Sequence, residues 1–121
     1  MSPLAQRFAE AVQVLIGDGP VKQRLATAYG QHLADLADAE FPAGLRRDFA
    51  DLQAAMSKTA PAGNESRARA SVQKMASAEA VGHAATIVRL YLGLMNTLER
   101  AEPLKVVASP RQPPRYLTGR S

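Results

Sequence analysis

The chain has 121 residues, 46% of them hydrophobic and 21% charged, a composition typical of one globular domain and not of a disordered polypeptide. The absence of cysteine excludes disulfides, thiolate nucleophiles and cysteine-ligated metal centres. Basic and acidic side chains balance through Glu102, so the net charge of +4 belongs entirely to the last nineteen residues. This asymmetry predicts an electroneutral body that carries a basic tail.

Residues 1–7 lack a basic segment followed by an apolar one, so no signal peptide is expected. No apolar run approaches the roughly 18 residues that cross a bilayer, since the longest candidate contains Arg89 and Asn96. We therefore expect a cytoplasmic protein without membrane association. The frequent use of alanine and arginine suggests a GC-rich bacterial genome.

The first three helices are predicted from apolar residues at helical spacing and from the breakers between them. Pro3 favours a helix over residues 3–16, which the Gly- and Pro-rich residues 17–20 end. Further helices are expected over 20–38 and 43–57. The apolar stripes of the three are Leu4, Phe8, Val12 and Leu15; Val21, Leu25, Tyr29, Leu33 and Leu36; and Leu45, Phe49, Leu52 and Met56.

Residues 58–64 are predicted to form a loop, with Asn64 as the N-cap of a short fourth helix that carries Ala68, Val72 and Met75. Ser77 favours the start of a fifth helix. Nothing at residues 76–79 forbids one continuous helix, so both arrangements are open.

The fifth helix has the clearest periodicity in the chain and is expected to contact most of the others. One apolar row is Val81, Ala84, Val88, Tyr91, Met95 and Leu98, and a second row beside it is Ile87, Leu90 and Leu94. A stripe this wide predicts burial against two neighbours, or against one neighbour and a second subunit. A homodimer is therefore one hypothesis.

Proline defines the C-terminal segment. Pro103 is expected to end the fifth helix, residues 104–107 are predicted to be extended, and the later prolines favour polyproline II geometry. The predicted fold is an all-α bundle of four to five helices over residues 1–102, followed by an extended, basic, proline-rich arm over residues 103–121.

No pattern indicates catalysis or metal binding. His32 has Asp35 three residues later, and His83 has no acid within a turn on its C-terminal side, which leaves too few ligands for a metal site. No nucleophile is accompanied by a base and an orienting residue, and no phosphate-binding loop pattern is present. We expect no enzyme activity and no catalytic, cofactor-binding or metal-ligating residues.

Two clusters of charge lie on the second and third predicted helices. Asp35, Asp38 and Glu40 form either a solvated helix face or a patch that docks a basic segment such as the tail. Arg46 and Arg47 are followed by two aspartates, which favours a helix-pairing or salt-bridged surface over a phosphate site.

The main basic cluster of the body is on the predicted fourth helix. Arg67, Arg69 and Lys74 are candidates for contact with nucleic acid, with Arg67 and Lys74 seven residues apart on one face. Glu65 and Glu79 flank the cluster and weaken that interpretation.

The tail has the features of a recognition peptide. Residues 110–115 match P-x-x-P-x-R, a pattern of polyproline ligands with a trailing arginine, and an aromatic–leucine pair follows it. The candidate partner-binding residues are Lys105, Arg111, Pro113, Pro114, Arg115, Tyr116, Leu117 and Arg120. The alternatives are a frayed terminus or a strap packed on the bundle through Leu104, Val106 and Val107.

These observations predict a small non-enzymatic adaptor or regulatory protein. Its bundle surface and basic tail would bind a partner protein with an acidic surface. The alternative is a nucleic-acid- or ribosome-associated factor that uses the tail together with the basic cluster of the fourth helix.

Overall fold

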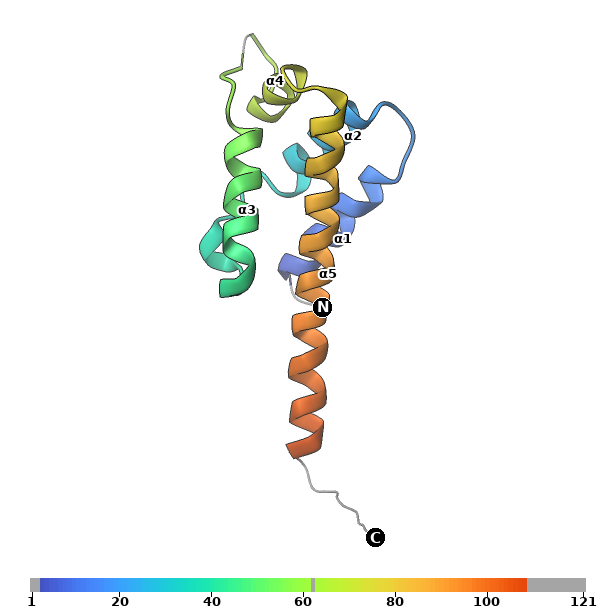
Figure 1. The fold of residues 1–121 in the computed structure, drawn as a ribbon, viewed down its shortest axis with the longest axis vertical. Helices are drawn as coiled ribbons and strands as arrows, with labels where there is room; N and C mark the ends of the chain where they lie inside the picture. Colours follow the sequence, from blue (N-terminus) through green and yellow to red (C-terminus); the bar gives the residue numbers. More distant parts are fainter. Residues whose placement is uncertain (1–2, 62, 109–121) are drawn as a thin grey trace.

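The computed structural model describes residues 3–61 and 63–108, and of residues 98–108 it describes the backbone alone. Within these residues the chain forms helices and no strand, which confirms the predicted all-α class and the helical bundle (Figure 1). The elements are α1 (Pro3–Leu15), α2 (Val21–His32), the 3-10 helix η1 (Asp38–Glu40), α3 (Ala43–Met56), α4 (Arg67–Gln73) and α5 (Ser77–Ala108).

Helix α5 is the central element, as the sequence predicted. It packs against α1, α2 and α3, while the short α4 lies across α2 and α3 at the end of the bundle where α5 begins (Figure 1). No helix in the described part of the chain combines the length and the apolarity needed to span a bilayer.

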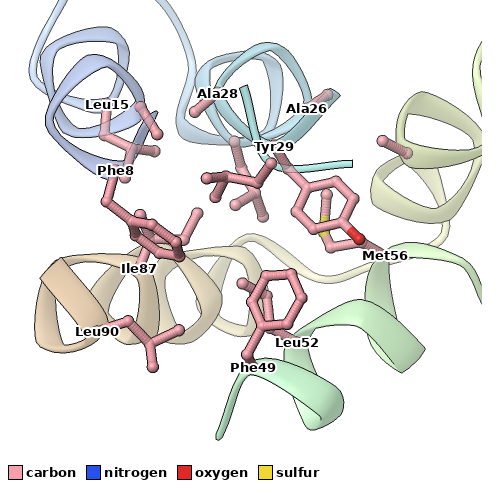
Figure 2. Close-up of a cluster of buried hydrophobic side chains, with 14 of the residues drawn as sticks. Phe8, Leu15, Ala26, Ala28, Tyr29, Phe49, Leu52, Met56, Ile87 and Leu90 are labelled. Carbon is pink, nitrogen blue, oxygen red and sulfur yellow. The ribbon is translucent and has the colours of Figure 1, made fainter. Parts of the chain in front are cut away.

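The core is built around the three phenylalanines of the chain. Phe8 from α1 meets Phe41 and Phe49 edge-on, with ring centroids 5.7 and 6.3 Å away, and Phe41 stacks on Phe49 at 4.3 Å. Figure 2 shows Phe8, Phe49 and Ile87 reaching into one cluster from α1, α3 and α5. All of these side chains are fully buried, so three helices depend on the same contacts.

The turn between α1 and α2 depends on one glycine and one arginine. Gly19 has φ of +103°, a conformation that residues with a Cβ rarely adopt. Arg24 reaches back from α2 and donates hydrogen bonds to the carbonyls of Leu15 and Gly19. The guanidinium thereby satisfies a carbonyl at the C-terminus of α1, where the helix dipole favours positive charge.

Helix α2 ends at His32 and not at residue 38 as predicted. The chain turns after His32, so that Leu33, Leu36 and Phe41 all become buried. A continued helix would have placed acidic residues at its C-terminal end, against the dipole. Residues 38–40 instead form η1, in which the Glu40 carboxylate accepts a hydrogen bond from the Ala37 N–H at 2.9 Å.

Helices α4 and α5 are separate, which decides a question that the sequence left open. Residues 74–76 lie between them in a non-helical conformation. The N-cap of α4 is Ser66, whose hydroxyl accepts from the Arg69 N–H at 3.0 Å, so the prediction of Asn64 as the cap was wrong by two residues. Asn64 lies in the preceding turn.

The buried row of α5 is not the one with the clearest register. Ile87, Leu90 and Leu94, with Ala80, face the core, whereas Ala84, Val88, Tyr91 and Met95 are half-buried and Val81 is 54% exposed. The two rows are adjacent on the helix, and the positions of α1, α2 and α3 decide which one is covered.

The prediction that Pro103 ends the fifth helix was wrong, because the α5 backbone continues to Ala108. Residues 104–107 are therefore helical and not extended. Proline fits the helical φ angle, and its cost is local: one missing N–H donor and crowding of the carbonyl four residues earlier. Residues 109–121, which include the predicted contacts from Arg111 to Arg120, lie outside the described residues.

Candidate interaction surfaces

One face of α5 is apolar and exposed. We define the α5 stripe as Val81, Ala85, Val88, Leu92 and Met95, which follow one another at steps of four, three, four and three residues. Val81 and Leu92 are 54% and 59% exposed, and Val88 and Met95 are half-buried. The stripe lies beside the row that faces the core: Val88 packs partly against that core, while Val81, Ala85 and Leu92 are exposed among the described residues.

A basic hollow of about 240 Å³ lies between α2 and α4. Lys22 and Arg69 line it from the two helices, and no carboxylate is among its lining residues, which are Pro20, Lys22, Gln23, Ala26, Arg69, Val72 and Gln73. The Lys22 ammonium also donates to the Gln73 carbonyl at 3.4 Å, near the C-terminus of α4. The hollow combines an apolar floor with cations, which suits an anionic group on a larger molecule.

A second hollow of about 210 Å³ lies where α2, α3 and α4 meet, beside Tyr29, Ser57 and Arg67. Burial raises the pKa of the Tyr29 hydroxyl, and a hydrogen bond with the Ser57 side chain partly opposes this rise. Arg67 donates to the Ser57 carbonyl at 3.4 Å. Tyr29 of α2 and Arg67 of α4 both bind Ser57 at the C-terminus of α3, so these contacts are structural.

The predicted basic cluster is divided between the two hollows. Arg67 lines the second hollow, Arg69 lines the basic hollow, and Lys74 is the exposed C-cap of α4. The sequence missed Lys22, because it comes from α2 and reaches Arg69 only through the packing of α2 on α4. Its position in the first turn of a helix gave no signal of this proximity.

The histidines pair with glutamates on neighbouring turns or helices. His32 Nδ1 lies 3.5 Å from Glu10 Oε1, and His83 Nε2 lies 3.6 Å from Glu79 Oε2. No group of three or more acidic, histidine or cysteine side chains close enough to hold a metal ion occurs among the described residues.

The predicted acidic patch is partly neutralised. Arg7 of α1 binds Asp35 with two hydrogen bonds, at 2.7 and 3.1 Å, and donates to the His32 carbonyl at 3.0 Å. This guanidinium lowers the pKa of the Asp35 carboxyl. Asp38 and Glu40 remain exposed on η1.

Arg46 and Arg47 do not form the salt bridges that the sequence favoured. Arg46 donates to the Phe41 carbonyl at 2.9 Å, and Arg47 is exposed. Among the described residues neither of them forms an ion pair.

Comparison with known proteins gives no relative. No family model, no curated protein and no solved structure matches this chain.

Proposed function

We propose that this protein is a small, non-enzymatic adaptor or regulatory protein of the cytoplasm. It binds a partner protein through the surface of its bundle and its basic C-terminal tail. The partner presents an acidic surface, because residues 103–121 carry four basic side chains and no acidic one.

The course of α5 is the observation that carries this proposal. Among the side chains of α5 that the structure describes, which end at Thr97, the last buried one is Leu94, and the helical backbone continues to Ala108, about 21 Å beyond Leu94. Figure 1 shows this part of α5 standing clear of α1 to α4. The described end of α5, at Ala108, therefore lies where a partner can approach without displacing the bundle.

The test compares the full chain with the truncation 1–108 and with the double variant Arg111→Glu and Arg115→Glu. A partner captured by cross-linking is purified, and its binding rates are then measured at two salt concentrations. We expect truncation to weaken binding at least tenfold and charge reversal to slow association, because exposed cations steer more than they anchor. Tyr116→Ala should instead raise the dissociation rate.

The double variant Arg47→Glu and Lys58→Glu is the matched control, since it makes the same change of four charge units at two exposed positions outside the tail. Its association rate should stay close to that of the unchanged protein. If the truncated protein binds as tightly as the full chain, the tail has no role in binding, and the binding surface lies on the bundle.

The basic hollow favours a second candidate function, binding of nucleic acid. Lys22 and Arg69 could contact one phosphate group, with Lys74 nearby at the end of α4. The test is fluorescence anisotropy with a labelled single-stranded RNA at several salt concentrations. The double variant Lys22→Gln and Arg69→Gln should make the logarithm of the association constant fall less steeply with the logarithm of the salt concentration. An unchanged slope, equal to that of Arg47→Gln, would exclude the hollow as a phosphate contact.

A further inference from the structure

The α5 stripe holds two of the three large apolar side chains that are exposed in the described part of the chain. These two are Val81 and Leu92, eleven residues apart, and the third, Ile16, lies just beyond the end of α1. Scattered exposed side chains are ordinary on protein surfaces, but a straight row along one helix points to a binding surface.

The spacing of the stripe identifies the shape of its partner. Steps of four, three, four and three residues give the 3.5-residue period with which two α-helices pack along their length. Ala85, near the middle of the row, allows a second helix to approach closely. The stripe therefore fits another helix with the same spacing, and the chain's own α5 is such a helix.

In an antiparallel second copy, four of the five stripe residues face one another, and Met95 faces Ala78. With a two-fold axis between Thr86 and Ile87, Val81 faces Leu92 of the other copy, and Ala85 faces Val88. Each strongly exposed side chain then covers the other, and the small residue lies opposite the branched one. Such an interface is isologous, as in most homodimers.

Charge also distinguishes the two orientations. Continued along the backbone of α5, the same spacing reaches positions 99 and 102, which are both glutamates in the sequence. In a parallel pair each position would meet its own copy, and the two basic tails would lie together. In the antiparallel pair, position 99 lies just beyond the N-terminus of the other copy's α5, where the helix dipole favours negative charge.

The size of the stripe sets the expected affinity. From Val81 to Met95 the row is about 21 Å long and one helix wide. This is smaller than the contact in stable interfaces, which bury roughly 1,200–2,000 Å², so a reversible dimer is expected and not an obligate one. The bundle has equal numbers of acidic and basic side chains through Glu102, and net charge does not oppose the association.

We propose that α5 is a self-association surface, on which two copies of this chain pair antiparallel along the α5 stripe, with a dissociation constant in the micromolar range. The pairing is independent of the partner-binding function. It places the C-terminal ends of the two α5 helices at opposite ends of the dimer.

Sedimentation equilibrium of the full chain, from about 1 to 200 µM, tests the surface. We expect a monomer–dimer equilibrium that Leu92→Glu weakens at least tenfold, because one charge then enters each end of the seam. Ile16→Glu is the control, since it exchanges an even more exposed apolar side chain for the same charge off the stripe. A monomer throughout the range, or equal effects of the two variants, would overturn the proposal.

Disulfide cross-linking tests the orientation. Because the chain has no native cysteine, only the introduced cysteines can form a disulfide. Val81→Cys and Leu92→Cys proteins are oxidised separately and as a mixture. The antiparallel pair predicts rapid cross-linking in the mixture alone, whereas a parallel pair predicts that each variant cross-links with itself. The second result would refute the orientation, and truncation at residue 108 should change neither outcome.

Discussion

At the scale of single residues, Arg7 shows how one side chain joins two helices. Its guanidinium binds the Asp35 carboxylate through both oxygens and also donates to the His32 carbonyl at the end of α2. A cation at this position satisfies a free carbonyl and complements the helix dipole. Arg7 therefore fixes the point at which α2 stops and the chain turns.

The Arg7–Asp35 pair predicts a pH dependence. Arg7 lowers the pKa of Asp35 in the folded state, so the pair's contribution is complete above the unfolded value of about 3.9 and is lost as pH falls through the lower folded value. Asp35→Asn should therefore lower the melting temperature by a constant amount between pH 5 and 8, and the difference should shrink below about pH 4.

Asp51→Asn, on the exposed face of α3, is the control for removing a carboxylate alone. A difference between the unchanged protein and Asp35→Asn that persists undiminished at pH 2 would show that the pair contributes through its hydrogen-bond geometry and not through its charge.

At the scale of the element, α5 presents two adjacent apolar rows of which the bundle buries one. Because Ile87 is fully buried and Val88 is half-buried, Ile87→Ala should cost about 2–5 kcal/mol in the free energy of unfolding, and Val88→Ala roughly 1 kcal/mol or less. Chemical denaturation at low micromolar concentration, where little dimer forms, measures both. A larger loss of stability for Val88→Ala than for Ile87→Ala would place the row that contains Val88 against the core.

Two glycines of α5 give a second prediction at this scale. A Cβ at Gly82 would meet nothing within 4 Å, whereas one at Gly93 would lie 2.9 Å from Leu45 Cδ2. Gly82→Ala should therefore raise the free energy of unfolding by about 0.5–1 kcal/mol through helix propensity alone. Gly93→Ala should stabilise the fold less, because the Leu45 methyl group has to move. Chemical denaturation measures both variants, and an equal increase in the free energy of unfolding would mean that α3 and α5 are not in close contact at Gly93.

At the scale of the whole molecule, the core and the net charge are separated along the chain. Among the side chains that the structure describes, the buried hydrophobic ones fall between Ala5 and Leu94, while the excess positive charge of the sequence lies after Glu102. Stability and electrostatic attraction therefore depend on different segments, so each can be changed without the other.

Removal of residues 109–121 tests this separation. The free energy of unfolding should change by no more than about 0.5 kcal/mol, since every residue of the core described above precedes residue 109. Thermal and chemical denaturation of the truncation 1–108 measure the change. A substantially larger loss would show that the tail is a strap packed on the bundle, and its role in binding would need to be reassigned.

Local chemistry determined much of this architecture. Apolar periodicity located α1 and α3 to within one residue at each end, and the glycines and prolines at residues 17–20 located the first turn, because these signals act within a few residues. The absence of cysteine and the charge asymmetry are likewise properties of the sequence alone.

Tertiary structure decided what depends on neighbours distant in the chain. The early end of α2 follows from the burial of Leu33, Leu36 and Phe41, and the choice of row on α5 follows from where α1, α2 and α3 pack. The basic hollow needs α2 against α4 to bring Lys22 to Arg69. Periodicity specifies which residues share a face, but only packing specifies which face is covered, because burial depends on the sum of all the helix contacts.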